Sequence, residues 1–147
     1  MVDDNIALLL CCARFVADGQ PRVSGTCGLV NLDGAPVTTD ELESMASLLE
    51  RRGPEGTGLW VEDAAGLGHT LLATTPEAVH ERLPLRHAAS GCVITADVRL
   101  DNRQELLPLL DLEGRSGIGG TGIGDAEIVL HAYLTWGEAC VDRLLGD

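Results

Sequence analysis

The first regular pattern of apolar positions lies in residues 26–49. The run Thr26–Leu32 is mostly apolar and ends at an Asp-Gly pair, which predicts a buried strand that closes in a turn. Thr38 and Glu41 have the spacing of a capping box, and the apolar positions after them recur with a helical period: Leu42, Met45, Ala46 and Leu49. The pattern therefore predicts a strand followed by a helix with one apolar stripe.

The next segment predicts a loop and two further strands. Residues 51–56, Arg-Arg-Gly-Pro-Glu-Gly, should end the helix, since glycine supplies positive φ and proline cannot continue the hydrogen-bond ladder. Strands are expected at Leu59–Val61 and Gly66–Leu72, joined by a turn around Asp63. Segment 74–83 stays open between a loop and a helical turn that begins at Pro76.

Residues 92–100 carry the clearest alternation of apolar and polar positions and predict a strand with one face in the core. Asp101 and Gln104 again have capping-box spacing, which predicts a short helix through Leu110. A loop with six glycines follows at 114–124, and a last helix is expected near Asp125. Residues 1–23 lack this order, so we expect a disordered appendage at 1–23 and a folded domain at 24–147.

Composition narrows the classes of partner. The chain has 147 residues and a formal net charge of −13, which fits one domain and gives no basic patch for nucleic acid or an anionic membrane. All ten basic residues are arginine, so chemistry that needs a lysine is excluded. The apolar run Ile6–Cys12 is too short to span a bilayer and follows two aspartates. We expect a cytoplasmic protein that binds neither nucleic acid nor membrane.

Single residues and short motifs point weakly to chemistry. The five cysteines show no paired metal-ligand spacing, so neither a metal site nor a disulfide framework is expected. The glycine run 117–124 lacks the Lys-Ser/Thr of a phosphate loop and is interpreted as a connector. Taken alone, Cys27 is a core cysteine more often than a nucleophile, and Asp125 is a helix N-cap more often than a ligand contact.

A set of motifs changes that interpretation. Five motifs, in this order and spacing, resemble the glutamine amidotransferase domain of asparagine synthetases: Cys27-Gly28-Leu29-Val30, Arg52-Gly53-Pro54-Glu55-Gly56-Thr57-Gly58, Gly66-Leu67-Gly68-His69, Gly124-Asp125-Ala126-Glu127 and Trp136-Gly137-Glu138. Three others further resemble the asparagine synthetase-like enzymes that cyclise lasso peptides: Thr74-Thr75-Pro76-Glu77, residues 96–103 and Leu144-Leu145-Gly146-Asp147.

The resemblance implies a fold and a set of roles. The fold is α+β, a four-layer αββα sandwich of the N-terminal-nucleophile hydrolase type, and it is expected to be incomplete at the C-terminal end of this chain. Cys27 is placed as the nucleophile that attacks the side-chain amide of glutamine, with its own α-amine as proton acceptor. Asp125 is placed on the α-ammonium of glutamine. No cofactor is expected in this chain.

Several other positions depart from the family pattern. The arginine that binds the glutamine carboxylate falls on Leu71, which cannot form a charge-assisted hydrogen bond. The Asn-Gly pair of the oxyanion hole falls on Asp97-Val98, and the glutamate after it becomes Arg99. Twenty-six residues precede Cys27, so its nitrogen is an amide and cannot act as a base. These differences predict weak or absent glutamine hydrolysis.

Two functions stay open from the sequence. The first is a glutamine amidotransferase domain of an asparagine synthetase-like protein, which releases glutamate and ammonia, is impaired, and has glutamine as its ligand if it is active. The second is a non-catalytic scaffold that supports an ATP-dependent synthetase or lasso-peptide cyclase domain as its partner. A free α-amine at Cys27 would favour the first, and the altered pocket positions favour the second.

Overall fold

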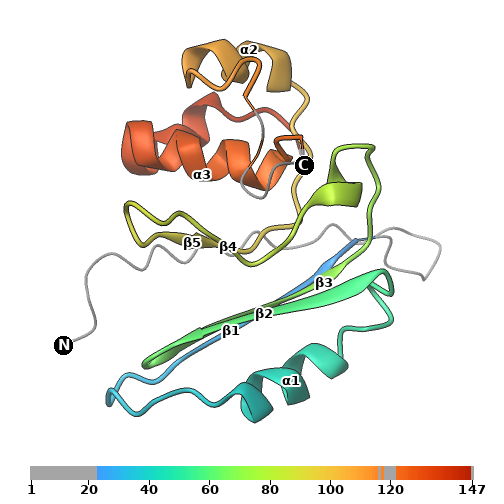
Figure 1. Ribbon diagram of the computed structural model, residues 1–147, viewed down its shortest axis with the longest axis vertical. Coiled ribbons are helices and arrows are strands. Elements are labelled where there is room, and N and C mark those ends of the chain that lie inside the picture. Colours follow the sequence, from blue (N-terminus) through green and yellow to red (C-terminus); the bar gives the residue numbers. More distant parts are fainter. Residues whose placement is uncertain (1–22, 116, 118–121, 147) are drawn as a thin grey trace. The chain divides into compact units, whose positions relative to one another are not determined.

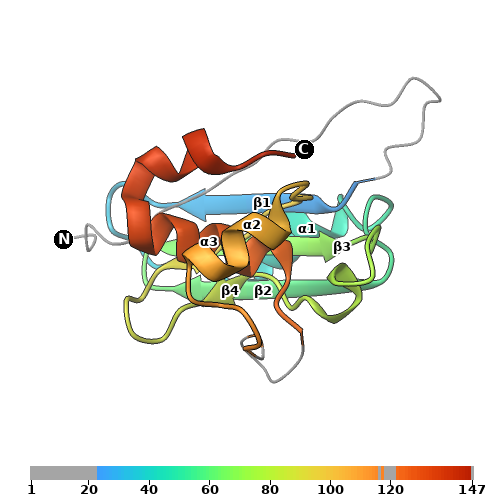
Figure 2. The same ribbon diagram turned by 90° about the horizontal axis from the view of Figure 1, so that it is seen from above.

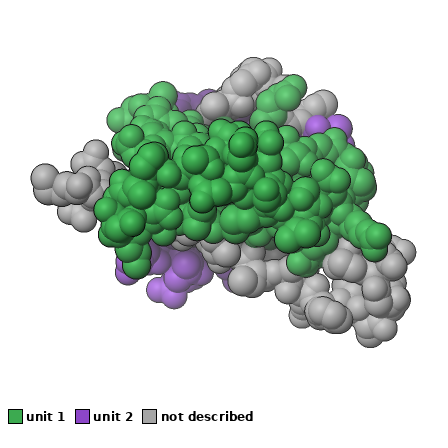
Figure 3. Space-filling view, turned by 90° about the horizontal axis from the view of Figure 1, so that it is seen from below, with its two compact units in different colours: residues 1–73, 82–97 green, residues 74–81, 98–147 purple. Residues whose placement is uncertain are grey.

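A computed structural model describes residues 23–115, 117 and 122–146. The chain divides into two compact units, which Figure 3 distinguishes by colour: residues 1–73 with 82–97, and residues 74–81 with 98–147. The predicted appendage, residues 1–23, lies outside the described residues except for Val23.

The first unit is built on a three-stranded antiparallel sheet. Its strands are β1 (Gly25–Val30), β2 (Gly56–Glu62) and β3 (Ala65–Leu71), in the order β1-β3-β2. All three were expected from the apolar pattern, and the predicted turn between β2 and β3 has Asp63 at a φ of 49°. The register sets Cys27 opposite Gly68, and His69 opposite both Thr26 and Gly58. Because side chains alternate along a strand, Cys27 and His69 point to opposite faces of the sheet.

Helix α1 (Thr39–Ser47) covers one face of this sheet (Figure 1). The predicted capping box is present: the Glu41 amide donates to Thr38 Oγ1 at 3.3 Å, and the Thr38 amide donates to Glu41 Oε2 at 2.9 Å. Leu42 and Ala46 are buried against Cys27, and further apolar side chains pack around them: Met45, Leu49, Leu59 and Val61. The predicted apolar stripe is therefore the helical half of the core on this face.

The opposite face carries a small second sheet of β4 (Leu85–Arg86) and β5 (Val93–Ile94) (Figure 1). The segment before β4 can approach β2 closely only because residue 58 is a glycine, since a Cβ there would lie 1.9 Å from the Leu83 carbonyl oxygen. Thr95, just after β5, contacts His69 of β3 through a hydrogen bond of 3.2 Å. The first unit thus has three layers: helix, three-stranded sheet and two-stranded sheet.

The prediction of one strand over 92–100 is largely wrong. Only Val93 and Ile94 form a ladder, with β4, and Leu100 makes an isolated bridge to Gly146. The alternation does not mark a solvated face, because Thr95 is 1% exposed and hydrogen-bonded in the core. Asp97 likewise accepts a hydrogen bond from a backbone amide. Polar residues with partners inside the protein produced the pattern of a half-exposed strand.

The second unit is mainly helical (Figure 2). It contains the single turn η1 (Ala78–His80), α2 (Arg103–Leu109), α3 (Asp125–Trp136) and η2 (Gly137–Arg143), which turns away from the axis of α3. The N-cap of α2 is Asn102 and not the predicted Asp101, whose carboxylate pairs with Arg99 at 3.1 Å. The Asp101 amide instead donates to the Leu145 carbonyl, which ties the segment after η2 to the start of α2.

The core beneath α1 gives a first prediction. Leu42 is fully buried, so Leu42→Ala should lower the free energy of unfolding by about 2–5 kcal/mol through lost burial and a residual cavity. Leu48→Ala, at a side chain 84% exposed just beyond the same helix, is the matched control and should change it by less than about 0.5 kcal/mol. Urea denaturation measures both, and equal effects of the two substitutions would contradict the packing described above.

Candidate functional site

The Cys27 thiol lies in an apolar environment on the α1 face of the sheet. The residue is 8% exposed and packs with Leu42 and Ala46. A Cβ at the facing Gly68 would lie 2.6 Å from Cys27 Sγ, so this glycine leaves the room that the sulfur occupies. Burial raises the pKa of the Cys27 thiol and outweighs the opposite effect of a hydrogen bond with the Gly68 backbone. The environment therefore favours the thiol over the nucleophilic thiolate.

The backbone before Cys27 is part of the sheet. Strand β1 begins at Gly25, two residues ahead of the cysteine, and Thr26 pairs with His69. The Gly25 amide donates to Thr70 Oγ1 at 3.1 Å. Cys27 is thus held as an interior strand residue whose nitrogen belongs to a peptide bond, and such a nitrogen cannot act as a base because its lone pair is delocalised into the carbonyl.

The positions that the resemblance assigns to glutamine recognition are divided between the two units. Leu71 ends β3 on the face opposite Gly68, so within the first unit its side chain and the Cys27 thiol lie on different faces of the sheet. Asp97 Oδ1 accepts a hydrogen bond of 3.2 Å from the Ser24 amide. Val98 and Arg99 begin the long C-terminal part of the second unit, where Arg99 forms the exposed ion pair with Asp101 described above.

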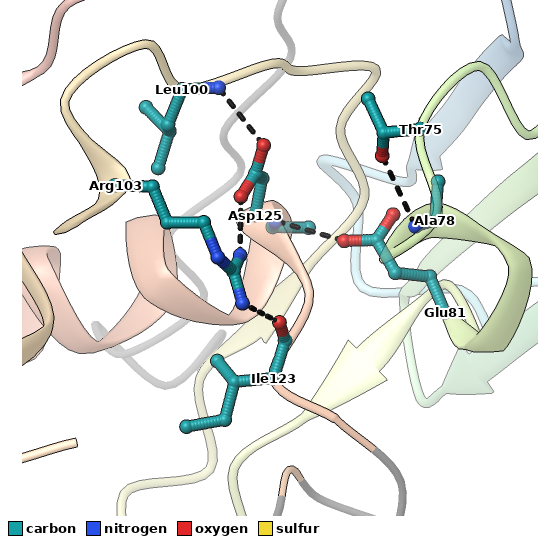
Figure 4. Close-up of polar contacts among 8 residues, drawn as sticks. Thr75, Ala78, Glu81, Leu100, Arg103, Ile123 and Asp125 are labelled. Carbon is teal, nitrogen blue, oxygen red and sulfur yellow. Dashed lines mark hydrogen bonds and ion pairs between the residues drawn. The ribbon is translucent and has the colours of Figure 1, made fainter. Parts of the chain in front are cut away.

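Asp125 lies in a polar cluster of the second unit (Figure 4). It is the first residue of α3 and not its N-cap, which is Gly124. Its Oδ2 accepts from the Leu100 amide at 2.9 Å, and its Oδ1 accepts from Arg103 Nη1 at 2.5 Å. Arg103 also donates to the Ile123 carbonyl. Both oxygens of the Asp125 carboxylate therefore have partners within the chain.

Glu81 is a member of this cluster that the sequence patterns did not indicate. Its Oε1 accepts a hydrogen bond of 3.1 Å from the Ala126 amide at the start of α3 (Figure 4). A Cβ at residue 124 would lie 2.1 Å from that oxygen, so Gly124 makes the approach possible. Burial raises the pKa of Glu81, and the nearby Asp125 carboxylate adds to the rise. The sequence offered one sign of this contact: the helix begins after Gly124, which has no side chain to accept from the first amides, so an acceptor from elsewhere in the chain is needed.

The His69 side chain is buried on the face of the sheet opposite Cys27. It is 2% exposed, its Nδ1 lies 3.2 Å from Thr95 Oγ1, and its Nε2 has no hydrogen-bond partner among the described residues. Burial lowers its pKa to about 4. The imidazole is therefore neutral at physiological pH.

In the described part of the chain, no three or more side chains of His, Cys, Asp or Glu are grouped so that they could hold a metal ion. No helix among the described residues has the length and apolar character needed to cross a membrane.

Comparison with known proteins identifies the domain. Residues 23–147 match a family described as "Glutamine amidotransferase domain". The chain belongs to this glutamine amidotransferase domain family. It is also similar to "Asparagine synthetase [glutamine-hydrolyzing] 3" of Bacillus subtilis (strain 168), with 28% identity over 106 residues. That alignment covers 71% of the chain and 17% of the relative, so the chain spans about a sixth of the relative's length. The mixed α+β structure with antiparallel sheets is compatible with this amidotransferase family.

The buried imidazole predicts a pH dependence of stability. The pKa of His69 is about 4 in the folded chain and 6.5 in the ordinary state, so the unfolded chain binds the proton more tightly. The free energy of unfolding should therefore show no effect of His69 protonation above pH 6.5. As the pH falls from 6.5 towards 4, protonation of His69 in the unfolded chain should lower this free energy by at most about 3 kcal/mol. Urea denaturation from pH 7.5 to 4 measures it. His69→Gln should flatten the curve in this window, and an unchanged curve would contradict the assignment.

The ion pair of the second unit predicts strong coupling. Arg103 and Asp125 have side chains only 17% and 9% exposed, so removal of either partner leaves a poorly solvated charge. A double-mutant cycle with Arg103→Met and Asp125→Asn should give a coupling energy of about 1–3 kcal/mol. Arg115→Met with Asp111→Asn, at an exposed pair, is the matched control and should give under about 0.5 kcal/mol. Equal coupling in both cycles would refute the special role of the buried pair.

Proposed function

We propose that this amidotransferase domain hydrolyses glutamine negligibly in its 147-residue form and serves as a non-catalytic scaffold for an ATP-dependent amide-forming domain. The observation that carries the proposal is the state of Cys27. Its thiol is buried among aliphatic side chains, and its nitrogen is a peptide amide inside β1. An N-terminal nucleophile needs both an accessible sulfur and a free amine as base, and the described Cys27 offers neither.

Substrate recognition supports the same proposal. Leu71 offers no positive charge for a glutamine carboxylate, since its side chain is aliphatic. Loss of one oxyanion-hole donor raises the activation barrier by about 2.7–4 kcal/mol. The Asp97 carboxylate would raise it further, because its negative charge repels a developing oxyanion. Asp125, the position assigned to the α-ammonium, already accepts from Arg103 and from the Leu100 amide. A glutamine ammonium would have to displace one of these partners.

The proposed architecture is the four-layer αββα sandwich of N-terminal-nucleophile hydrolases. The helix, three-stranded sheet and two-stranded sheet of the first unit follow three successive layers of that arrangement. The second unit, taken by itself, contains two α-helices among the described residues, and the longer one, α3, is largely buried. Cys27 lies two residues after the start of β1, Gly25–Val30, which accords with the family's placement of this cysteine near the start of the first strand.

The partner in this proposal is a synthetase or cyclase domain. The relative from Bacillus subtilis is named an asparagine synthetase and is about six times longer than the aligned segment. The motifs at 74–77, 96–103 and 144–147 further resemble lasso-peptide cyclases, so we propose a peptide-cyclising domain as one form of this partner. The scaffold itself needs no cofactor.

A second candidate is an active glutaminase. Cys27 and Asp125 are both present at the family positions, which favours this alternative. It requires that residues 1–26 be removed so that the Cys27 amine becomes free. It also requires that the thiol become accessible from its present place beneath α1.

Glutamate release from glutamine tests the proposed function. The full chain should release no more glutamate than its Cys27→Ala variant, because neither a free amine nor a thiolate is present. A variant with Leu71→Arg, Asp97→Asn and Val98→Gly restores the family residues of the pocket and should stay equally inactive, since the amine is still blocked.

A chain that begins at Cys27 completes this experiment. Turnover that appears in this chain and disappears with Cys27→Ala would favour the active glutaminase. Turnover by the full chain that depends on Cys27 would sink the scaffold proposal outright.

A further inference from the structure

Several hydrogen bonds converge on Ser24, the residue just before β1. Ser24 is 5% exposed although it lies near the start of the described chain. Its amide donates to Asp97 Oδ1 at 3.2 Å. Its Oγ accepts from the Leu72 amide at 3.2 Å and lies 3.5 Å from the Leu72 carbonyl oxygen, to which it can donate. Ser24 therefore joins the start of β1 to the residue after β3 and to the segment after β5.

The end of β3 is held from its other side as well. The Glu55 amide donates to the Leu71 carbonyl at 3.1 Å, and the Glu55 carboxylate accepts from the Ala73 amide at 2.9 Å. A Cβ at Gly53 would lie 2.0 Å from the Thr70 carbonyl oxygen, so the loop before β2 packs directly on this backbone. Leu72 is thus a fixed point between two anchored neighbours, and a bond to Leu72 fixes Ser24 in turn.

We infer that Ser24 and Asp97 form a lock that fixes the residues immediately before Cys27 at the start of β1, so that the native arrangement of the first sheet depends on them. The acceptor in this lock is a carboxylate, and its donor is an amide that exists only while the chain continues upstream of Cys27. Removal of residues 24–26 would leave the Leu72 amide without its partner and the Asp97 carboxylate without this donor. A partly buried donor or acceptor that has lost its hydrogen-bond partner lowers the free energy of unfolding.

The lock gives Asp97 a role that needs no substrate. Asp97 is a positioning residue: it holds the upstream backbone, and it touches no reacting atom in this arrangement. The geometry also shows how Ser24 and Gly25, ahead of the cysteine, are held by side chains and backbone of the first unit. Any effect of the lock on glutamine hydrolysis rests on the proposed function, whereas the lock itself is a property of the fold.

Native-state hydrogen exchange of the full chain, without glutamine, tests the lock. Asp97→Ala should accelerate exchange at the Ser24, Gly25 and Leu72 amides by about 5- to 100-fold. The Leu42 amide in α1 should change less than about twofold, because it belongs to a separate hydrogen-bonded element. Asp97→Asn keeps an oxygen acceptor and should stay close to the wild type. Glu43→Gln, at an exposed carboxylate of α1, is the matched control and should change none of these rates.

Two results of this experiment would contradict the lock. Unchanged exchange at Ser24 and Gly25 in Asp97→Ala, or uniform acceleration at every amide, would overturn the lock. If Asp97→Ala does not fold, Ser24→Ala decides: it removes the acceptor of the Leu72 amide, and exchange there must rise at least about fivefold. Because the readout needs no turnover, failure of the lock is distinct from failure of the proposed function, which only glutamate release can show.

Discussion

The first unit depends on the pairing of β3 with both β1 and β2. Alternation along this central strand sets Gly66, Gly68 and Thr70 on one face, and Leu67, His69 and Leu71 on the other. The two glycines leave the first face thin enough for close packing: a Cβ at Gly66 would lie 3.0 Å from Val37 Cγ1, and one at Gly68 would strike Cys27 Sγ. On one side the strand therefore packs against α1 and the Cys27 sulfur, and on the other it directs its own His69 imidazole to Thr95.

This division of faces decides what the site can do chemically. A nucleophile, its base and its oxyanion donors must converge on one reacting atom. Here the Cys27 thiol is directed beneath α1, Leu71 points to the opposite face, and Asp97 is bonded to the Ser24 backbone. Asp97 thus accepts an internal hydrogen bond of the first unit, and Leu71 pairs with Gly56 of β2. Both positions therefore contribute to the fold itself.

Local signals in the sequence predicted the first unit well, and long-range contacts account for the failures. The capping box at Thr38 depends on residues three positions apart, and each strand of the first sheet is a short apolar run that ends at a turn or loop. Both signals are therefore visible in the chain, although the pairing of β1 with β3 is long-range. The alternation at 92–100 misled because Thr95 and Asp97 find partners 26 and 73 residues away. Glu81 reaches the start of α3 across 45 residues, and no periodicity records such a contact.

The second unit shows why Asp125 matches the family pattern without serving as evidence for glutamine binding. The start of a helix has unpaired amides and a partial positive charge, both of which favour carboxylates. Glu81 supplies an acceptor to one amide, and Asp125 fixes Leu100 and Arg103 against the same helix start. The Arg103 guanidinium pairs with Asp125, and its charge lowers the pKa of Glu81 against the rise that burial and the Asp125 carboxylate cause. Asp125 therefore takes part in the hydrogen bonding around the start of α3 itself, so an aspartate at this position has a structural reason that is independent of any ligand.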